Sequence, residues 1–320
     1  MTDSVPEPEA QREPEAPRGP EPSREAGPSR EPLSPNEPVS APDPLSLAIS
    51  PCPNDTFTFH AWVHGLVPGA PPVTVTYADI DVTNTAAEKA AYDVVKVSYA
   101  ALPWLLDAYQ LLPCGGALGR GCGPLVLTAE DTDPERAVRG RTVAIPSDRS
   151  TAYLLFRLWS AKFPPDRILV MPFHRIMPAV RDREVDAGLV IHEARFTYQT
   201  YGLHSVADLG DWWEGETGLP IPLGAILARR ELDGPAITGW IRESVRLAWA
   251  DPQASEAYVR EHAQEMEPDV VRRHIDLYVN EFTADLGDEG YEAVRTLLDR
   301  AAAEGLVPAV PPEALTRATR

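Results

Sequence analysis

The segment Gly188-Leu-Val-Ile-His-Glu-Ala-Arg-Phe-Thr-Tyr198 joins an apolar run to a group of polar side chains. Residues 188–191 are partly β-branched and follow a helix-like stretch at 177–185, which indicates a buried strand of an α/β unit. His192 comes directly after this strand, and ligands bind past the carboxyl ends of strands in open α/β sheets. Because a histidine exchanges protons near neutral pH, His192 is a candidate general base. The structural alternative is a strand-end histidine that only hydrogen-bonds a backbone carbonyl.

The same alternation of strand and helix extends over most of the chain. The pattern predicts strands at 45–50, 73–77, 92–98, 125–128, 141–146, 168–172, 188–191, 203–209 and 221–228. It predicts helices between them at 57–65, 85–91, 99–109, 152–163 and 175–183. This order is typical of an α/β layer architecture. From residue 235 onward the pattern is helical only, with helices expected at 237–250, 253–264, 268–280 and 288–304.

Composition excludes several classes of function. A length of 320 residues suggests about two domains. The net charge of −19 argues against nucleic-acid binding and against binding to anionic membranes, since both need basic surfaces.

We expect no transmembrane helix, because no apolar stretch reaches about 18 residues, and no secretory signal. Residues 1–44 are rich in Pro, Glu, Ser and Arg, which predicts a disordered tail.

The three cysteines, Cys52, Cys114 and Cys122, are odd in number and form no C-x-x-C pair. They therefore indicate neither a structural zinc site nor a disulfide framework. Reduced thiols in a cytoplasm are the simplest interpretation, so we expect a cytoplasmic protein.

Two further polar groups interrupt apolar segments. Lys96 and Ser98 share one face of the strand at 92–98, and a lysine in so apolar a run must pair or reach a ligand. Ser150 and Thr151 open the helix at 152–163, where hydroxyls and free N–H groups bind carboxylate or phosphate. Capping alone would account for one of these two hydroxyls.

Two turns carry less specific signals. In residues 53–56, Asn54, Asp55 or Thr56 is expected to cap the helix that follows. The glycine-rich segment 114–124 is neither a P-loop, since it lacks the Gly-Lys-Ser/Thr ending, nor a dinucleotide-binding loop, since no capped helix follows it. It is expected to shape a ligand crevice or a domain crossing, with a plain surface loop as the equal alternative.

Six motifs in this order resemble the 1,4-dihydroxy-6-naphthoate synthase family, which acts in menaquinone biosynthesis by the futalosine pathway. The motifs are Ser50-Pro-Cys-Pro-Asn-Asp-Thr-Phe57, Lys96-Val-Ser-Tyr-Ala100, Gly115-Gly-Ala-Leu-Gly-Arg-Gly121, Ser150-Thr-Ala-Tyr153, Ile191-His-Glu-Ala-Arg-Phe-Thr-Tyr198 and Leu219-Pro-Ile-Pro-Leu-Gly224. The resemblance covers about residues 45–307. The family's usual pattern has two threonines where this chain has Ser150 and Thr151, so the hydroxyl is kept.

The resemblance implies a two-lobed fold like that of the type II periplasmic binding proteins, with a central ligand cleft and a helical C-terminal region. Lobe one would comprise residues 45–130 and 223–320, and lobe two residues 131–222. The family converts cyclic dehypoxanthine futalosine to 1,4-dihydroxy-6-naphthoate and dihydroxyacetone. It is a carbon–carbon lyase, and no metal or organic cofactor is expected.

Carried over by position, the resemblance makes a neutral His192 the proton acceptor. Lys96, Val97 and Ser98, together with Ser150 and Thr151, would hold the substrate. Either Lys96 or the turn at Ser150 could neutralise the substrate carboxylate, and the sequence does not decide between them. Two other functions stay open, namely the chorismate dehydratase of the same pathway and a binding protein for a small carboxylate.

Overall fold

The computed structural model of this chain describes residues 43–263 and 267–316. The tail expected at residues 1–44 falls outside this part of the chain except for its last two positions. The residues in these two ranges belong to one compact unit. In the described ranges no helix is long and apolar enough to cross a membrane.

The first sheet has the strand order β2-β1-β3-β11-β4, and β5 also pairs with β11. Its strands are β1 (Leu45–Ile49), β2 (Val73–Tyr77), β3 (Val94–Ser98), β4 (Tyr109–Leu111), β5 (Ala117–Gly119) and β11 (Ile221–Arg229). The first three are parallel and are connected through helices α1 (Pro53–Val63) and α2 (Ile80–Ala87). β11 comes after the second sheet in the sequence and pairs antiparallel with β3, so the chain returns to this sheet after building the second one.

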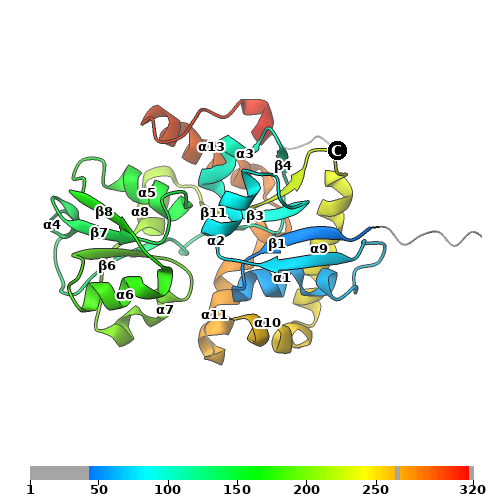
Figure 1. Cartoon of the computed structure of the whole chain (residues 1–320), viewed down its shortest axis with the longest axis horizontal. Helices are drawn as coiled ribbons and strands as arrows, with labels where there is room; N and C mark the ends of the chain where they lie inside the picture. Colours follow the sequence, from blue (N-terminus) through cyan, green and yellow to red (C-terminus); the bar gives the residue numbers. More distant parts are fainter. Residues whose placement is uncertain (1–42, 264–266, 317–320) are drawn as a thin grey trace, which may run out of the picture. The chain divides into compact units, whose positions relative to one another are not determined.

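The second sheet has the order β10-β6-β9-β7-β8. Its strands are β6 (Leu125–Thr128), β7 (Thr142–Ile145), β8 (Arg167–Val170), β9 (Ala187–Val190) and β10 (His204–Asp208). Its helices are α4 (Pro134–Val138), α5 (Thr151–Trp159), α6 (Phe173–Arg181), α7 (Ala194–Thr197) and α8 (Leu209–Thr217). Figure 1 shows these helices, in green shades, around the second sheet. Strands β7, β8 and β9 are parallel, as expected for a strand–helix alternation.

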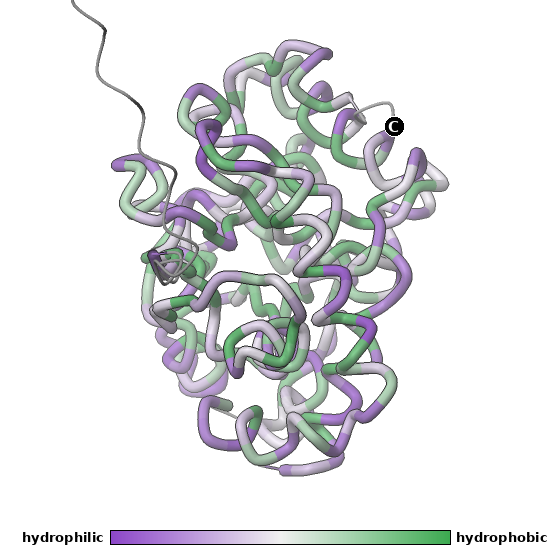
Figure 2. Tube along the Cα trace, turned by 90° about the vertical axis from the view of Figure 1, so that its right-hand side faces the viewer, coloured by the Kyte–Doolittle hydropathy of each residue, from purple (hydrophilic) through white to green (hydrophobic). Residues whose placement is uncertain are grey.

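The helical C-terminal region predicted from the sequence is confirmed. It consists of α9 (Gly234–Ala250), α10 (Glu256–His262), α11 (Pro268–Tyr278), α12 (Glu281–Ala284) and α13 (Gly287–Ala303). Helices α9, α10 and α11 all contact α1 of the first sheet. In Figure 2 many of the outer turns of the chain are hydrophilic, whereas the strands of both sheets carry the fully buried aliphatic side chains of the core.

The pairing of the strands indicates where the chain crosses from one sheet to the other, and so where the expected lobes would be divided. The expected division places strand β6 in lobe one, but β6 pairs with β9 and β10 of the second sheet. On this criterion the first crossing between the sheets lies between β5 and β6, before Leu125 rather than after Glu130. The return crossing lies at the start of β11, close to the expected Pro222.

One predicted helix is wrong in its second half. The expected helix at 99–109 is a 3₁₀ turn at Tyr99–Ala101 and a short helix α3 (Leu102–Leu105), after which Tyr109 opens β4. Tyr109 is fully buried, pairs with Arg229 of β11, and donates its hydroxyl to the carbonyl of Tyr92 at 2.8 Å. These long-range contacts outweigh local helix propensity.

The tryptophan pair after β10 lies in a helix that the sequence did not predict. The carboxylate of Asp208 accepts hydrogen bonds from the backbone N–H groups of Gly210 and Asp211 and so caps α8. Trp213, the second tryptophan of this pair, belongs to the hydrophobic core. Its side chain is fully buried, and its indole N–H donates to the carbonyl of Pro220 at 3.0 Å.

Candidate active site

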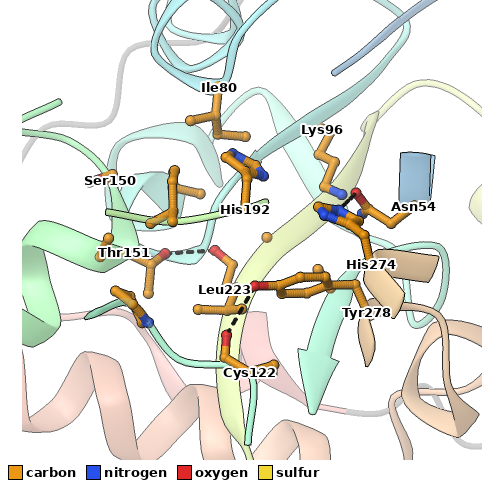
Figure 3. A pocket seen from close by; sticks show the side chains of 16 residues that line it. Asn54, Ile80, Lys96, Cys122, Ser150, Thr151, His192, Leu223, His274 and Tyr278 are labelled. Carbon is orange, nitrogen blue, oxygen red and sulfur yellow. Dashed lines mark hydrogen bonds between the residues drawn. The ribbon is translucent and has the colours of Figure 1, made fainter. Parts of the chain in front are cut away.

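A cavity lies where the two sheets and helix α11 meet, and Figure 3 shows the side chains that line it. Its empty space is about 590 Å³ when the open solvent at its mouth is included. Five of the six predicted site residues line it: Lys96, Ser98, Ser150, Thr151 and His192. The structure therefore brings together residues that are up to 96 positions apart in the sequence.

Val97 is the predicted site residue whose side chain does not line the cavity. Its side chain is fully buried and belongs to the hydrophobic core. Side chains alternate between the two faces of a strand, so Lys96 and Ser98 of β3 face the cavity while Val97 faces away. A contact of Val97 with the substrate stays a prediction, and it would have to come from the backbone rather than from this side chain.

The prediction that Lys96 must pair or reach a ligand is confirmed. Its ammonium forms a buried ion pair with the carboxylate of Asp55 on α1. The other donors to this carboxylate are the hydroxyl of Ser50 at 2.7 Å, the N–H of Ser50 at 3.1 Å and the amide of Asn54 at 2.8 Å. Since Asp55 is the one acceptor for Lys96 among the described residues, two ammonium N–H groups are left for a ligand.

Asp55 was expected as a possible helix cap, together with Asn54 and Thr56, and this prediction is wrong. Helix α1 begins at Pro53, two residues earlier than Asp55, and the capping position is Cys52, whose side chain makes no capping hydrogen bond. Proline favours the first helical position, because it lacks the N–H that would be unpaired there. The polar side chains of the first turn thus remain available to build the site.

The side chain of Ser98 is held from α2. Asn84 donates its amide to the Ser98 hydroxyl at 3.1 Å and accepts the Ser98 backbone N–H at 2.8 Å. The hydroxyl therefore acts as an acceptor toward Asn84 and keeps its own proton for another group. The same amide lies 3.4 Å from the carbonyl of Arg149, so Asn84 also ties β3 to the turn that precedes α5.

His192 has a strained backbone and one oriented ring nitrogen. It follows β9 with a φ of +54°, in the left-handed region, which residues other than glycine rarely adopt, although histidine does so more often than most. Its Nδ1 lies 3.5 Å from the sulfur of Cys52, and its ring meets Phe173 edge-on. No backbone carbonyl is within hydrogen-bond distance of its ring in the described part of the chain, which argues against the purely structural alternative. With Nδ1 directed to Cys52, Nε2 is left for a ligand.

The surroundings of His192 act on its pKa in opposite directions. Burial lowers the pKa of the imidazole, but the adjacent Cys52 and the Glu193 carboxylate raise it more, to about 9. These interactions favour the protonated ring, and the neutral His192 that a general base requires stays a prediction. The same interactions that favour the protonated ring also make His192 a stronger base toward a bound carbon acid.

The hydroxyls of Ser150 and Thr151 are both used within the protein. Ser150 caps α5 by accepting the N–H of Tyr153 at 3.1 Å, and it donates to the carbonyl of Ser147. Thr151 donates to the carbonyl of Leu223 at 2.7 Å, shown as a dashed line in Figure 3, and accepts the N–H of Ala100 at 3.2 Å. What remains for a ligand here is the backbone N–H groups in the first turn of α5, a helix with no acidic side chain in that turn.

The glycine-rich segment forms both the crossing and part of the cavity wall. It contains β5, which pairs with β11, and leads directly into β6 of the second sheet. Ala117, Cys122 and Pro124 of this segment line the cavity. The plain surface loop is thereby excluded. Gly123 packs so closely against Gly210 that a Cβ atom on Gly123 would lie 2.0 Å from the Gly210 nitrogen.

Among the lining residues that the sequence does not single out as ligand contacts, three have polar side chains on helices. His274 and Tyr278 come from α11, and Asn54 comes from the first turn of α1. A helical pattern places every third or fourth side chain on the inner face, but it does not say that a buried histidine among them faces a cavity. His274 donates or accepts at Nε2 to the side-chain oxygen of Asn54 at 3.0 Å.

Metal-ligand chemistry is present in one place among the described residues. Cys52, His192 and Glu193 bring a sulfur, a ring nitrogen and a carboxylate oxygen within 4.8 Å of one another. Such a set could hold a zinc ion. The three cysteines are free, as expected from their number and spacing.

Comparisons with known proteins agree on one family. Residues 45–303 match the family model described as "Menaquinone biosynthesis". A protein of Streptomyces coelicolor named 1,4-dihydroxy-6-naphthoate synthase is 67% identical over 278 residues, which is 85% of this chain and 97% of the relative. A protein of Thermus thermophilus with the same name is 46% identical over 265 residues, 82% of this chain and 95% of the relative.

Solved structures agree on the fold. A crystal structure of a protein from Archaeoglobus fulgidus is 34% identical, with a TM-score of 0.76, and the match covers 82% of this chain and 98% of that one. The periplasmic aliphatic sulphonate binding protein of Escherichia coli has a TM-score of 0.62 at 15% identity, covering 85% and 91%. The predicted α/β fold of the periplasmic-binding-protein type is thus confirmed.

Proposed function

The chain belongs to the menaquinone biosynthesis family of 1,4-dihydroxy-6-naphthoate synthases and is an enzyme, and we propose that it converts cyclic dehypoxanthine futalosine to 1,4-dihydroxy-6-naphthoate and dihydroxyacetone. In this proposal the enzyme is a carbon–carbon lyase of the futalosine pathway. The observation that carries it is the position of His192, whose Nδ1 is directed to Cys52 while its ring lines the cavity.

The substrate carboxylate binds at the N-terminus of α5 in this proposal. Free N–H groups and the helix dipole favour an anion at that end, and no acidic side chain competes in the first turn. The other candidate, Lys96, already has its charge balanced by Asp55. Its two remaining N–H groups, together with the Ser98 hydroxyl, are suited to substrate hydroxyls.

The chemical step starts with removal of a substrate proton by Nε2 of His192. Cys52 stabilises the imidazolium that forms, by the same interaction that raises the pKa of the ring. The carbon–carbon bond to the three-carbon fragment then breaks and the ring system becomes aromatic, while the leaving fragment takes up the proton from His192, which restores the base. General-base catalysis of this kind typically contributes about 10²–10⁴-fold to the rate.

We propose that the two sheets are the cores of two lobes that close over the substrate. The lobes would comprise residues 45–124 with 223–320, and residues 125–222. Closure excludes water and aligns the leaving fragment. The reaction would take place in the cytoplasm, where the free thiol of Cys52 stays reduced.

The test is to incubate the full chain with cyclic dehypoxanthine futalosine and to analyse the mixture by liquid chromatography and mass spectrometry. We expect 1,4-dihydroxy-6-naphthoate and dihydroxyacetone in equal amounts. A parallel incubation with chorismate tests the dehydratase of the same pathway, and it should leave chorismate unchanged. Saturable binding of the futalosine derivative without product would contradict the proposal and favour a binding protein.

A further inference from the structure

A second imidazole faces the cavity. His274 of α11 is about 1% exposed and lines the cavity together with His192. The two rings are nearly parallel, with an angle of 9° between their planes and 6.2 Å between their centroids. Figure 3 shows His274 next to Lys96 and Asn54, on the side of the cavity opposite Ser150 and Thr151.

The hydrogen bonds around His274 define which of its nitrogens carries the proton. The Asn54 amide nitrogen donates to the Asp55 carboxylate at 2.8 Å, so the Asn54 side-chain oxygen is free to accept. That oxygen lies 3.0 Å from Nε2 of His274, which must therefore carry the hydrogen. In a neutral imidazole the other nitrogen, Nδ1, is then an acceptor only.

The surroundings keep this ring neutral. Burial is the main cause that lowers the pKa of His274 well below its ordinary value, and the nearby charges of His192 and Lys96 lower it further. The carboxylate of Asp55 is one residue along from Asn54, but it is already paired with Lys96. His274 is thus held as a neutral ring with its proton at Nε2.

The acceptor at Nδ1 has no partner. Among the described residues, two buried side-chain nitrogens lack a hydrogen bond, Nδ1 of His274 and Nε of Arg229. Arg229 does not line the cavity, and its guanidinium is engaged through its other nitrogens with the Ala90 carbonyl and Glu231. A buried acceptor without a partner is unfavourable, so a site that keeps one is suited to a ligand that supplies the donor.

We propose that Nδ1 of His274 accepts a hydrogen bond from a hydroxyl group of the bound substrate. This inference rests on the proposed function and deepens it, because it assigns a specificity-determining contact to α11. A carboxylate has no proton to donate and would be repelled by an acceptor nitrogen. The two ends of the cavity therefore have complementary chemistry, with an anion site at α5 and a hydroxyl site at His274.

Two substitutions separate a ligand contact from a structural role. The amide of glutamine takes approximately the place of Nε2, and the amide of asparagine approximately that of Nδ1. His274→Gln therefore keeps the donor to Asn54 and loses the acceptor in the cavity, whereas His274→Asn keeps an acceptor in the cavity and loses the donor. His262→Gln is the matched control, since His262 of the neighbouring α10 bonds the Tyr258 carbonyl outside the cavity.

With cyclic dehypoxanthine futalosine, we expect His274→Gln to raise KM about 10-fold with less than about a threefold change in kcat. His274→Asn should stay within about threefold of the wild-type KM, and His262→Gln should have no effect. An unchanged KM in His274→Gln, or an equal or larger rise in His274→Asn, overturns the proposal, because the bond to Asn54 would then be the relevant one. Absence of naphthoate from the wild-type protein would instead overturn the proposed function.

A second measurement does not depend on how well the His274 variants fold. The His192→Asn protein is labelled with ¹⁵N at histidine and titrated with the same substrate, which it should bind without turnover. We expect the Nδ1 resonance of His274 to move on binding, while its Nε2 resonance stays. An unmoved Nδ1 resonance at saturation overturns the proposal.

Discussion

The sulfur of Cys52 lies 3.5 Å from Nδ1 of His192, a contact that joins the turn before α1 to the residue after β9. The two residues are 140 positions apart in the sequence. The contact fixes which ring nitrogen is available to a ligand, and it is the main reason that the pKa of His192 is raised despite burial. The contact with Cys52 therefore sets both the orientation of the His192 ring and its basicity.

Replacing Cys52 should move the pH dependence of the reaction to lower pH. A general base works only when it is unprotonated, so kcat/KM of the wild-type enzyme should rise with pH up to about 9. In Cys52→Ala, burial and the charge of Lys96 still lower the pKa of His192, but the raising effect of Cys52 is gone. The rising limb of the pH profile should therefore move to lower pH by at least about one unit.

The measurement is a profile of kcat/KM across the neutral and alkaline range. Cys114→Ala is the matched control, because Cys114 is buried away from His192 and bonds the Thr238 carbonyl. An unshifted limb in Cys52→Ala would show that the thiol does not set the pKa of His192.

Replacing His192 should slow the chemical step strongly and leave the fold in place. Asparagine is the better replacement, because it tolerates the positive φ of this position, whereas alanine would add strain. We expect His192→Asn to lower kcat by at least about 10²-fold. Thermal unfolding and circular dichroism check that the variant is folded, and a kcat close to that of the wild type would remove His192 from its proposed role.

The general plan of the site could be predicted because it follows from topology. Polar residues after β9 and on β3 were expected at the carboxyl ends of strands, where α/β sheets bind ligands. A lysine within an apolar strand had to find a partner, since an unpaired buried charge is very costly. The five predicted lining residues follow from these two arguments together with the hydroxyl pair at the start of α5.

The partners within the site could not be predicted, because they depend on contacts between distant segments. The role of Asp55 as the partner of Lys96 was hidden by its position in a turn, where capping is the commoner use. His274 lies 220 positions from Asn54 and has no motif of its own. The pKa of His192 depends on Cys52, which periodicity alone does not bring near it.

Replacing Lys96 should weaken both substrate binding and stability. Lys96→Met leaves the Asp55 carboxylate buried without its counter-charge, although three donors from Ser50 and Asn54 remain. Breaking a buried ion pair in this way typically costs about 3 kcal/mol of unfolding free energy. KM should rise more than kcat falls, because the ammonium is proposed to hold ground-state hydroxyls.

Urea denaturation and steady-state kinetics measure these two effects. Lys89→Met is the control, since Lys89 is exposed and its loss should change the stability by less than about 0.5 kcal/mol. A fall in kcat alone would mean that Lys96 acts in the transition state rather than in binding.

Adding one methyl group at Gly123 should be far more damaging than adding one at Gly215. A Cβ atom at position 123 would lie 2.0 Å from the nitrogen and 2.4 Å from the Cα of Gly210, and both are backbone atoms that cannot rotate away. The crossing segment would have to separate from α8, so Gly123→Ala should cost about 3 kcal/mol. At Gly215, which is exposed in α8, the added atom meets nothing within 4 Å.

Gly215→Ala should instead stabilise the protein by up to about 1 kcal/mol, because alanine favours the helix. Urea denaturation of the two variants gives the comparison, and the substrate KM of Gly123→Ala shows whether the neighbouring cavity wall at Cys122 and Pro124 has moved. Equal stability of the two variants would mean that the close approach of Gly123 to Gly210 is not required for the crossing between the sheets.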